Sequence, residues 1–510
     1  MRITFAASEG VPYSKTGGLA DVVGALPKAL SALGHEITVF LPRYKNTRPQ
    51  QERLAIPNLS VPMQDYLLFC QVIDGGKHDG VQFYFVEHPE FSARDGLYGD
   101  AKGDYPDNAE RFMLFCRAVI ESSKRLGPPD IFHVHDWQTS LIPVLARTIY
   151  GHDATFAHTG TVLTIHNIGY QGLFPNSVMP KLLLPWTLFT MDKLEFYDKV
   201  NFLKGGIVYA DYVTTVSKTY AKEIQTYEYS FGLTATIRQK RHNLVGIVNG
   251  VDYSEWNPEA DQHLPAHFSA ADLSGKTVCK AALLEEYGIP QSKLEAPVIG
   301  IISRFAAQKG FDLMELALPK LLAEDVVIVV LGTGEHHYEA MFKTLHRRFK
   351  DRLCVKIAYD NRLAHLVEAG SDMFLMPSHY EPCGLTQIYS MRYGTVPVVR
   401  ATGGLEDTVE QWDPATRTGT GFKFSGYTAP ELLSAMREAL AVFPNKEDWK
   451  QLMLNGMRQN FSWDEPAREY VKVYEDAKAM HVHHGDTEAR RTEEPKLTTE
   501  DTKEHKGKAS

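Results

Sequence analysis

The hexapeptide Thr-Gly-Gly-Leu-Ala-Asp occupies residues 16–21, and a second version, Thr-Gly-Gly-Leu-Glu-Asp, occupies residues 402–407. Each copy follows a short apolar run and opens a segment whose apolar residues recur at helical spacing. Both therefore predict a strand, a glycine loop and the start of a helix. Paired glycines allow close backbone approach, and the N–H groups of a helix start favour an anion. One loop in each half suggests a ligand held between two similar domains, with two ordinary strand-to-helix turns as the alternative.

Strands and helices are predicted to alternate on both sides of these loops. Residues 18–33 have helical spacing, with Pro27 expected to kink or end the helix, and 37–41 completes a βαβ unit. Residues 54–87 predict hairpin-like strands inserted in the first domain. Other predicted strands are 131–135, 161–165, 212–216, 244–248, 298–303, 326–331, 353–357, 372–376 and 396–399. This alternation predicts two doubly wound α/β domains, with polar residues after the strands, where such sheets bind ligands.

The expected domain boundaries follow this alternation. We expect an N-terminal domain at 1–255, a second domain at 256–462 and a C-terminal helix at 463–480. Residues 481–510 contain few apolar side chains and mixed charges, so they are predicted to be a disordered tail.

Composition excludes several classes of protein. The 510 residues carry a net charge of −9, which argues against a nucleic-acid surface over the whole chain. The five cysteines are scattered and form no zinc pattern, which fits a reducing cytosol. Neither a signal peptide nor an apolar run of about 18 residues is evident, so we expect a cytoplasmic protein without membrane partners.

Several polar residues lie where a ligand would bind. Lys15 precedes the first glycine loop, and Arg304 and Lys309 follow a predicted strand. Two cations five residues apart before a helix suit a pyrophosphate, although solvated surface charges are the alternative. Glu381 lies in a loop between a strand and a helix, and His166 ends a strand. The alternative for Glu381 is a solvent-facing carboxylate, and the alternative for His166 is a histidine whose hydrogen bonds are satisfied at the end of a strand.

Six phrases together resemble the bacterial glycogen synthase and plant starch synthase family of retaining glucosyltransferases. They occur in family order and cover roughly residues 1–478, at positions 15–19, 166–167, 249–252, 303–310, 381–385 and 402–405. The resemblance implies the GT-B fold, in which two Rossmann-like domains face each other across a cleft. It also implies transfer of glucose from ADP-glucose to the non-reducing end of an α-1,4-glucan, with retention and without a metal or other cofactor.

The resemblance also assigns roles to residues. Lys15 and Gly18 would meet the diphosphate from the first domain, and Arg304 and Lys309 would neutralise it from the second. Glu381 would bind the glucose hydroxyls. The other residues placed at the site are His166 beside the reacting carbon, Tyr359 near adenine, Gly404 and Leu405 as N–H donors to phosphate, Asn249, Cys383, Gly384, Leu385 and Thr402 in the ADP-glucose site, and Asp21 and Asp136 on the acceptor side.

The chemistry of the candidate residues favours one mechanism. A double displacement needs two carboxylates about 5 Å apart. The sequence offers one convincing carboxylate, Glu381, and has Tyr389 where many GT-B enzymes carry a second glutamate. We therefore favour departure and attack on one face of the sugar. The alternatives are a pyridoxal-phosphate glycan phosphorylase, a non-catalytic glucan-binding protein and an enzyme that uses UDP-glucose.

Overall fold

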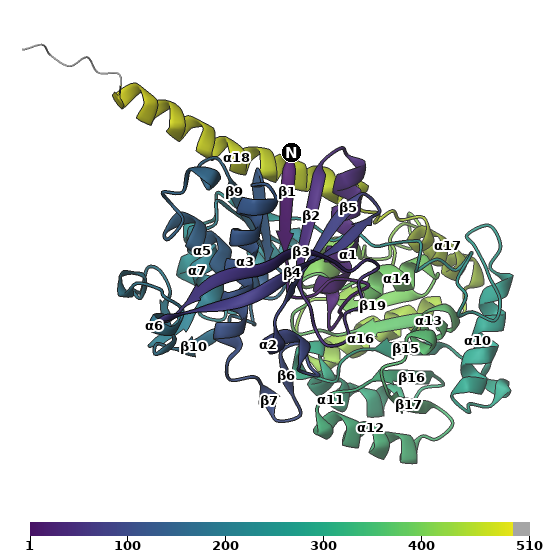
Figure 1. The fold of residues 1–510 in the computed structure, drawn as a ribbon. Coiled ribbons are helices and arrows are strands. Elements are labelled where there is room, and N and C mark those ends of the chain that lie inside the picture. Colours follow the sequence, from purple (N-terminus) through teal and green to yellow (C-terminus); the bar gives the residue numbers. More distant parts are fainter. Residues whose placement is uncertain (493–510) are drawn as a thin grey trace, which may run out of the picture.

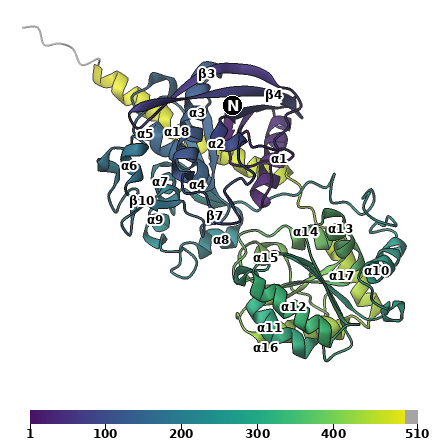
Figure 2. The same ribbon diagram turned by 60° about the horizontal axis from the view of Figure 1, so that its bottom comes forward.

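The structure is a computed structural model and describes residues 1–492. It has two α/β lobes, and the long helix α18 (Asp464–Thr492) runs back over the first lobe (Figures 1 and 2). The N-terminal lobe contains a nine-stranded sheet in the order β14-β13-β9-β8-β1-β2-β5-β4-β3. The C-terminal lobe contains a six-stranded sheet in the order β17-β16-β15-β18-β19-β20. The prediction of two Rossmann-like domains is therefore confirmed as an architecture.

The elements that position the site have the following bounds. The strands of the first sheet are β1 (Arg2–Ala6), β2 (Glu36–Pro42), β3 (Arg53–Met63), β4 (Tyr66–His78), β5 (Val81–Glu87), β8 (Ile131–His135), β9 (Gly160–Ile165), β13 (Tyr212–Thr215) and β14 (Leu244–Gly246). Those of the second are β15 (Val298–Ile302), β16 (Val327–Gly332), β17 (Leu353–Ile357), β18 (Met373–Met376), β19 (Val396–Arg400) and β20 (Phe422–Phe424). The main helices are α1 (Gly18–Ala32), α3 (Asn108–Leu126), α8 (Lys218–Glu223), α10 (Ser274–Glu286), α11 (Phe311–Leu321), α13 (Asn361–Gly370), α14 (Thr386–Arg392), α15 (Gly403–Thr408), α16 (Ala429–Val442) and α17 (Lys446–Met457).

The first βαβ unit forms as its sequence pattern indicates. Strands β1 and β2 are parallel, and α1 covers them with an apolar face that includes Leu26 and Leu30. Pro27 does not end the helix, which continues to Ala32. A proline within a helix removes one backbone hydrogen bond, and here its ring is buried with the apolar face.

The predicted hairpins belong to the main sheet. Strands β3, β4 and β5 pair antiparallel, and β5 also pairs in parallel with β2. They therefore extend the parallel sheet to its edge, where β3 is the last strand. Pro57 and Pro62 on β3 lack the N–H that a neighbouring strand would need, which suits an edge position.

Each parallel sheet has one point where the direction of strand addition reverses. In the first sheet this point lies between β1 and β8, and in the second between β15 and β18. The loops that leave neighbouring strands at such a point diverge and leave a crevice at their carboxyl ends. The loops after these four strands are therefore the ones expected to hold a ligand.

Helix α18 completes the hydrophobic core of the N-terminal lobe. Tyr470, Tyr474 and Ala477 are buried against the first sheet, and the Tyr474 hydroxyl lies 2.8 Å from His133 Nδ1. Lys478 adds an ion pair to Asp130 at 2.7 Å. The C-terminal segment is thus a structural part of the first lobe.

Helix α18 continues to Thr492 and so includes residues 481–492, which the sequence analysis assigns to the tail. His481 Nε2 lies 2.6 Å from Arg147 Nη2 and 3.0 Å from Asp211 Oδ2. The rest of the predicted tail, 493–510, lies outside the described residues.

No helix within residues 1–492 combines the length and the apolar character that a membrane span requires.

Candidate functional site

The reversal point of the second sheet brings two predicted site residues into contact. Lys309 follows β15, Glu381 follows β18, and the two are 72 positions apart in the sequence. Lys309 Nζ donates to Glu381 Oε1 at 2.9 Å and Oε2 at 2.7 Å, and Ser378 Oγ donates to Oε2 at 3.0 Å. Glu381 is buried, so its carboxylate has a fixed orientation. In this structure the charge of Lys309 is therefore paired with that of Glu381.

Arg304 lies at the other end of the same loop and reaches the N-terminal lobe. Its Nη2 atom lies 3.3 Å from the hydroxyl of Tyr170, which belongs to the loop after β9. No carboxylate pairs with Arg304 among residues 1–492, whereas both Lys309 and Lys15 have acidic partners. Arg304 is thus the predicted phosphate-binding cation whose charge is not already balanced.

The reversal point of the first sheet brings two carboxyl groups into the same region. Glu9 follows β1 and accepts hydrogen bonds from the backbone and the hydroxyl of Thr16. Asp136 follows β8, and its Oδ1 accepts the backbone N–H of His166 at 2.7 Å. Burial raises the pKa of Glu9 to about 7 and the pKa of Asp136 to about 7. Both carboxyl groups therefore have pKa values close to neutral pH.

Asp136 holds the loop after β9 in place. It has a φ of 53°, a left-handed conformation that aspartate tolerates better than most residues. Its contact with the backbone of His166 makes it a support for that residue. Sequence reasoning placed Asp136 on the acceptor side and missed Glu9, although an acid shortly after a buried strand at a reversal point is a signal that could have found it.

His166 is tethered through its ring as well as its backbone. Its Nε2 atom lies 3.0 Å from Nδ1 of His135, the last residue of β8. Burial lowers the pKa of His166 to about 3, so its imidazole is neutral at ordinary pH. Sequence reasoning did not single out His135.

The first glycine loop faces the second lobe. A Cβ atom built on Gly18 has Leu385 Cδ1 as its nearest neighbour, at 3.9 Å. Lys15 Nζ forms an ion pair with Asp21 Oδ1 at 2.7 Å and lies within electrostatic range of Tyr359. The Tyr359 side chain is 85% exposed. Residues predicted from both halves of the chain therefore meet across one cleft.

The second glycine loop is differently engaged. The Thr402 hydroxyl and the Gly403 N–H both donate to Glu223 Oε1 of the first lobe, at 2.8 and 3.0 Å. The N–H of Gly404 donates to the Glu381 carbonyl, and that of Leu405 to the Thr402 carbonyl, each at 3.0 Å. In this conformation Gly404 and Leu405 do not offer these N–H groups to a phosphate, in contrast to the role that the resemblance implies.

Helices α8 and α15 cap each other across the two lobes. Glu223, at the end of α8, accepts from the start of α15, as described above. Asp407, near the end of α15, accepts from the Thr219 N–H at 2.9 Å and from its hydroxyl at 2.6 Å at the start of α8. Each helix thus supplies a carboxylate to the other's first turn, where N–H groups lack helical partners.

The remaining predicted residues line the same region. Cys383 is buried, and burial raises the pKa of its thiol to about 12, so it does not supply a thiolate. Gly384 has a φ of 69°, which favours glycine, and directly precedes Leu385 at the start of α14. Asn249 is buried, and its Oδ1 has no hydrogen-bond donor among the described residues. Cys383 and Gly384 thus belong to the same loop as Glu381.

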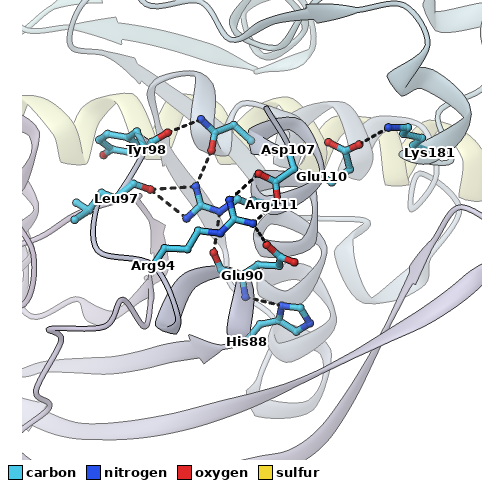
Figure 3. Close-up of polar contacts among 10 residues, drawn as sticks. His88, Glu90, Arg94, Leu97, Tyr98, Asp107, Glu110, Arg111 and Lys181 are labelled. Atoms are coloured by element: carbon cyan, nitrogen blue, oxygen red, sulfur yellow. Dashed lines mark hydrogen bonds and ion pairs between the residues drawn. The ribbon is translucent and has the colours of Figure 1, made fainter. Parts of the chain in front are cut away.

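A polar cluster holds the backbone of Leu97 and Tyr98 against the start of α3 (Figure 3). Arg94 binds Asp107 through two hydrogen bonds of 2.5 and 2.7 Å, and Arg111 donates to the Leu97 carbonyl at 3.1 Å. These contacts fix Tyr98, whose hydroxyl lies 2.7 Å from Ser8 Oγ, next to Glu9.

Within the described part of the chain, no three His, Cys, Asp or Glu side chains gather as a metal site would require.

Known proteins match both lobes. Residues 2–239 match the starch synthase catalytic domain family, and residues 285–451 match the glycosyl transferases group 1 family. A glycogen synthase from Koribacter versatilis is 59% identical over 480 residues, which cover 94% of this chain and 99% of that protein. A glycogen synthase from Anaeromyxobacter sp. (strain Fw109-5) is 49% identical over 476 residues, which cover 93% of this chain and 99% of that protein.

Solved structures agree with these matches. The catalytic domain of starch synthase IV from Arabidopsis thaliana, bound to ADP and acarbose, has a TM-score of 0.86 and 33% identity, covering 94% of this chain and 99% of that one. Sucrose-phosphate synthase from Thermosynechococcus elongatus shares the fold, with a TM-score of 0.59 and 15% identity, over 94% of this chain and 99% of that one. The chain has the GT-B fold and belongs to the glycogen and starch synthase family of glycosyltransferases.

Proposed function

We propose that this glycosyltransferase transfers glucose from ADP-glucose to the non-reducing end of an α-1,4-glucan, with retention of configuration and release of ADP. The observation that carries the proposal is the approach of the two lobes at the first glycine loop, where a Cβ on Gly18 would lie 3.9 Å from Leu385 Cδ1, four residues after the Glu381 that Lys309 binds. The starch synthase IV structure holds ADP, the nucleotide product that we propose.

The chemistry requires stabilisation of a diphosphate that gains negative charge as the glycosyl bond breaks. Arg304 and Lys309 would provide it from the second lobe and Lys15 from the first, because preorganised cations in a dry cleft stabilise developing charge strongly. Glu381, oriented by Lys309 and Ser378, would accept hydrogen bonds from the hydroxyls of the transferred glucose. His166 would contact the sugar beside the reacting carbon.

Two lobes closing on the donor would supply proximity and exclude water, which otherwise hydrolyses it. We propose that the acceptor attacks on the face from which the diphosphate departs. We also propose that the enzyme works in the cytoplasm and without a metal ion or pyridoxal phosphate. Activity that survives excess EDTA, and a purified protein without absorbance at 330–420 nm, would support the absence of these cofactors.

The decisive experiment compares nucleotide release from ADP-glucose and from UDP-glucose, with and without glycogen. Glycogen-dependent release of ADP supports the proposal, and preferential release of UDP supports the UDP-glucose alternative. Glucan binding without nucleotide release from either donor would indicate a non-catalytic glucan-binding protein.

A second experiment tests the residues. Arg304→Ala and Lys309→Ala should each lower kcat by roughly 10²–10³-fold, more than they raise the KM for donor, as expected for groups that act on the transition state. The double variant should lose less than the product of the two single losses, because both groups act on one leaving diphosphate. If kcat were unchanged and only the KM for donor rose, Arg304 and Lys309 would serve only to bind the donor.

A further inference from the structure

We propose that His135 is a positioning residue that holds the ring of His166 so that only Nδ1 faces the substrate, as a hydrogen-bond donor. The inference rests on the proposed function, in which His166 contacts the transferred glucose. The observation behind it is the contact of 3.0 Å between His135 Nδ1 and His166 Nε2, where His135 ends β8 and His166 directly follows the neighbouring parallel strand β9.

The His135 ring is itself immobile. It is fully buried, stacked on Phe5 with ring centroids 5.5 Å apart and packed against His133 at 4.3 Å. Its backbone N–H donates to Thr139 Oγ1 at 2.7 Å. Because neither backbone nor ring can move far in a close-packed core, His135 presents Nδ1 in one direction.

His166 is thereby held at two points. Asp136 accepts its backbone N–H, and His135 engages one ring nitrogen. The other ring nitrogen, Nδ1, has no hydrogen-bond partner among residues 1–481, whose side chains the structure describes. A ring tethered in this way cannot flip by 180° to exchange its nitrogens without breaking the bond to His135. Orientation within a fraction of an ångström is what a catalytic contact needs from its supports.

The contact also selects a tautomer. One imidazole must donate and the other accept. His135 Nε2 is buried without a partner, and an orphaned N–H is rarer in proteins than an under-satisfied acceptor. His135 therefore carries its proton on Nδ1 and donates it, so His166 accepts at Nε2. A neutral His166 then carries its own proton on Nδ1, where it can donate to a sugar oxygen.

Two variants of similar size test this role. His135→Asn keeps an amide N–H near the position of Nδ1, whereas His135→Leu has nearly the same shape and no donor. We expect His135→Asn to retain kcat within about fivefold and His135→Leu to lose about 10–100-fold, with donor KM changed less than kcat. His133→Leu is the control, since His133 lies on the same buried strand but bonds Thr164 and Tyr474 instead. It should affect thermal stability more than kcat.

A cycle with His166→Ala separates positioning from general structural damage. In that background His135→Leu should change kcat by less than about twofold, because no ring remains to be positioned. Losses that multiply independently, or equal kcat in the Asn and Leu variants, would overturn the proposal. Full activity of His166→Ala alone would instead count against the role of His166 in the proposed function.

The wild-type enzyme offers a test that does not depend on whether the variants fold. Nitrogen-15 chemical shifts of its histidines distinguish the two neutral tautomers, and the His166 signals are identified by their absence in His166→Ala. We expect His166 to carry its proton on Nδ1. A proton on Nε2 would overturn the inference.

Discussion

The two glycine loops share a hexapeptide but engage their surroundings differently. In both, the threonine hydroxyl donates to a glutamate, yet the buried Glu9 lies seven residues before Thr16 whereas the half-buried Glu223 comes from the other lobe, 179 residues before Thr402. No acceptor for the N–H groups of Gly18 and Leu19 is present in the described structure, while those of Gly404 and Leu405 are occupied. One loop is thus open to a ligand and the other joins the lobes.

The difference shows what a short motif determines. The hexapeptide specifies a strand, a turn and a helix start, and both copies adopt this form. What the exposed N–H groups bind is decided by the neighbours that the fold supplies. The first helix, α1, has 15 residues, and the second, α15, has only six and ends in a contact with α8.

The largest expected effect contrasts one glycine from each loop. A Cβ on Gly404 would overlap the backbone of Cys383, whereas a Cβ on Gly18 has no neighbour closer than 3.9 Å. Gly404→Ala should therefore lower the free energy of unfolding by about 3 kcal/mol or more. Gly18→Ala should leave stability within about 1 kcal/mol but raise the KM for ADP-glucose, because the methyl group points into the cleft. Denaturant unfolding and steady-state kinetics measure both, and equal destabilisation would contradict the contrast.

The second effect concerns Glu9 and pH. The folded state raises the pKa of Glu9 from 4.5 to about 7, so between these values the folded protein keeps a proton that the unfolded chain releases. The stability contributed by this proton is complete below pH 4.5 and is lost as pH rises through 7, by on the order of 3 kcal/mol. Glu9→Gln should flatten that decline and be more stable than the wild type at pH 8, but not at pH 4.5.

Urea unfolding at several pH values between 4.5 and 8 tests the prediction for Glu9. Asp136 contributes a decline of the same sign, because burial also raises its pKa to about 7, so the Glu9→Gln variant should keep part of the wild-type slope. Parallel curves for the variant and the wild type would show that Glu9 ionises normally in the folded protein.

A smaller effect is expected at the contact between the lobes. Asp407→Ala removes the acceptor of both the backbone and the hydroxyl of Thr219, and should cost about 1–3 kcal/mol. Because the contact joins the lobes, small-angle scattering should also show a larger radius of gyration for the variant. A Thr219→Ala change added to Asp407→Ala should cost little more, and full additivity would argue against the contact.

The smallest effect is expected at the corresponding position of the first loop. Asp21 pairs with Lys15 at 2.7 Å, and the Lys15 side chain is 42% exposed. An ion pair so open to solvent contributes about 0–1 kcal/mol, so Asp21→Ala should barely change the unfolding midpoint. If Asp21→Ala lost as much stability as Asp407→Ala, the ion pair of the first loop would contribute as much to folding as the contact between the lobes.

Much of the fold was predictable because the spacing of apolar residues along the sequence indicates which side chains of a strand or helix are buried. The strands after which the site residues lie were located from apolar runs, and Lys309 and Glu381 were both singled out. Their mutual ion pair was not predicted, because it depends on β15 and β18 being neighbours in the sheet, which strand order alone decides. Glu9 and His135 were missed for the same reason, since their partners Thr16 and His166 become significant only once the loops are placed. How far α18 runs was not predictable from apolar spacing, because residues 482–492 include few apolar side chains.

The return of α18 to the first lobe has a consequence for the order of synthesis. The Tyr474 hydroxyl meets His133, 341 residues earlier in the chain, and Tyr470 and Ala477 close the same apolar surface. A ribosome that has made all of the first lobe has not yet made the helix that covers it. The second lobe can reach its native state on emergence, whereas the first must wait, with an open apolar surface, until translation has nearly ended. The first half of the chain to be made is thus the last to finish folding.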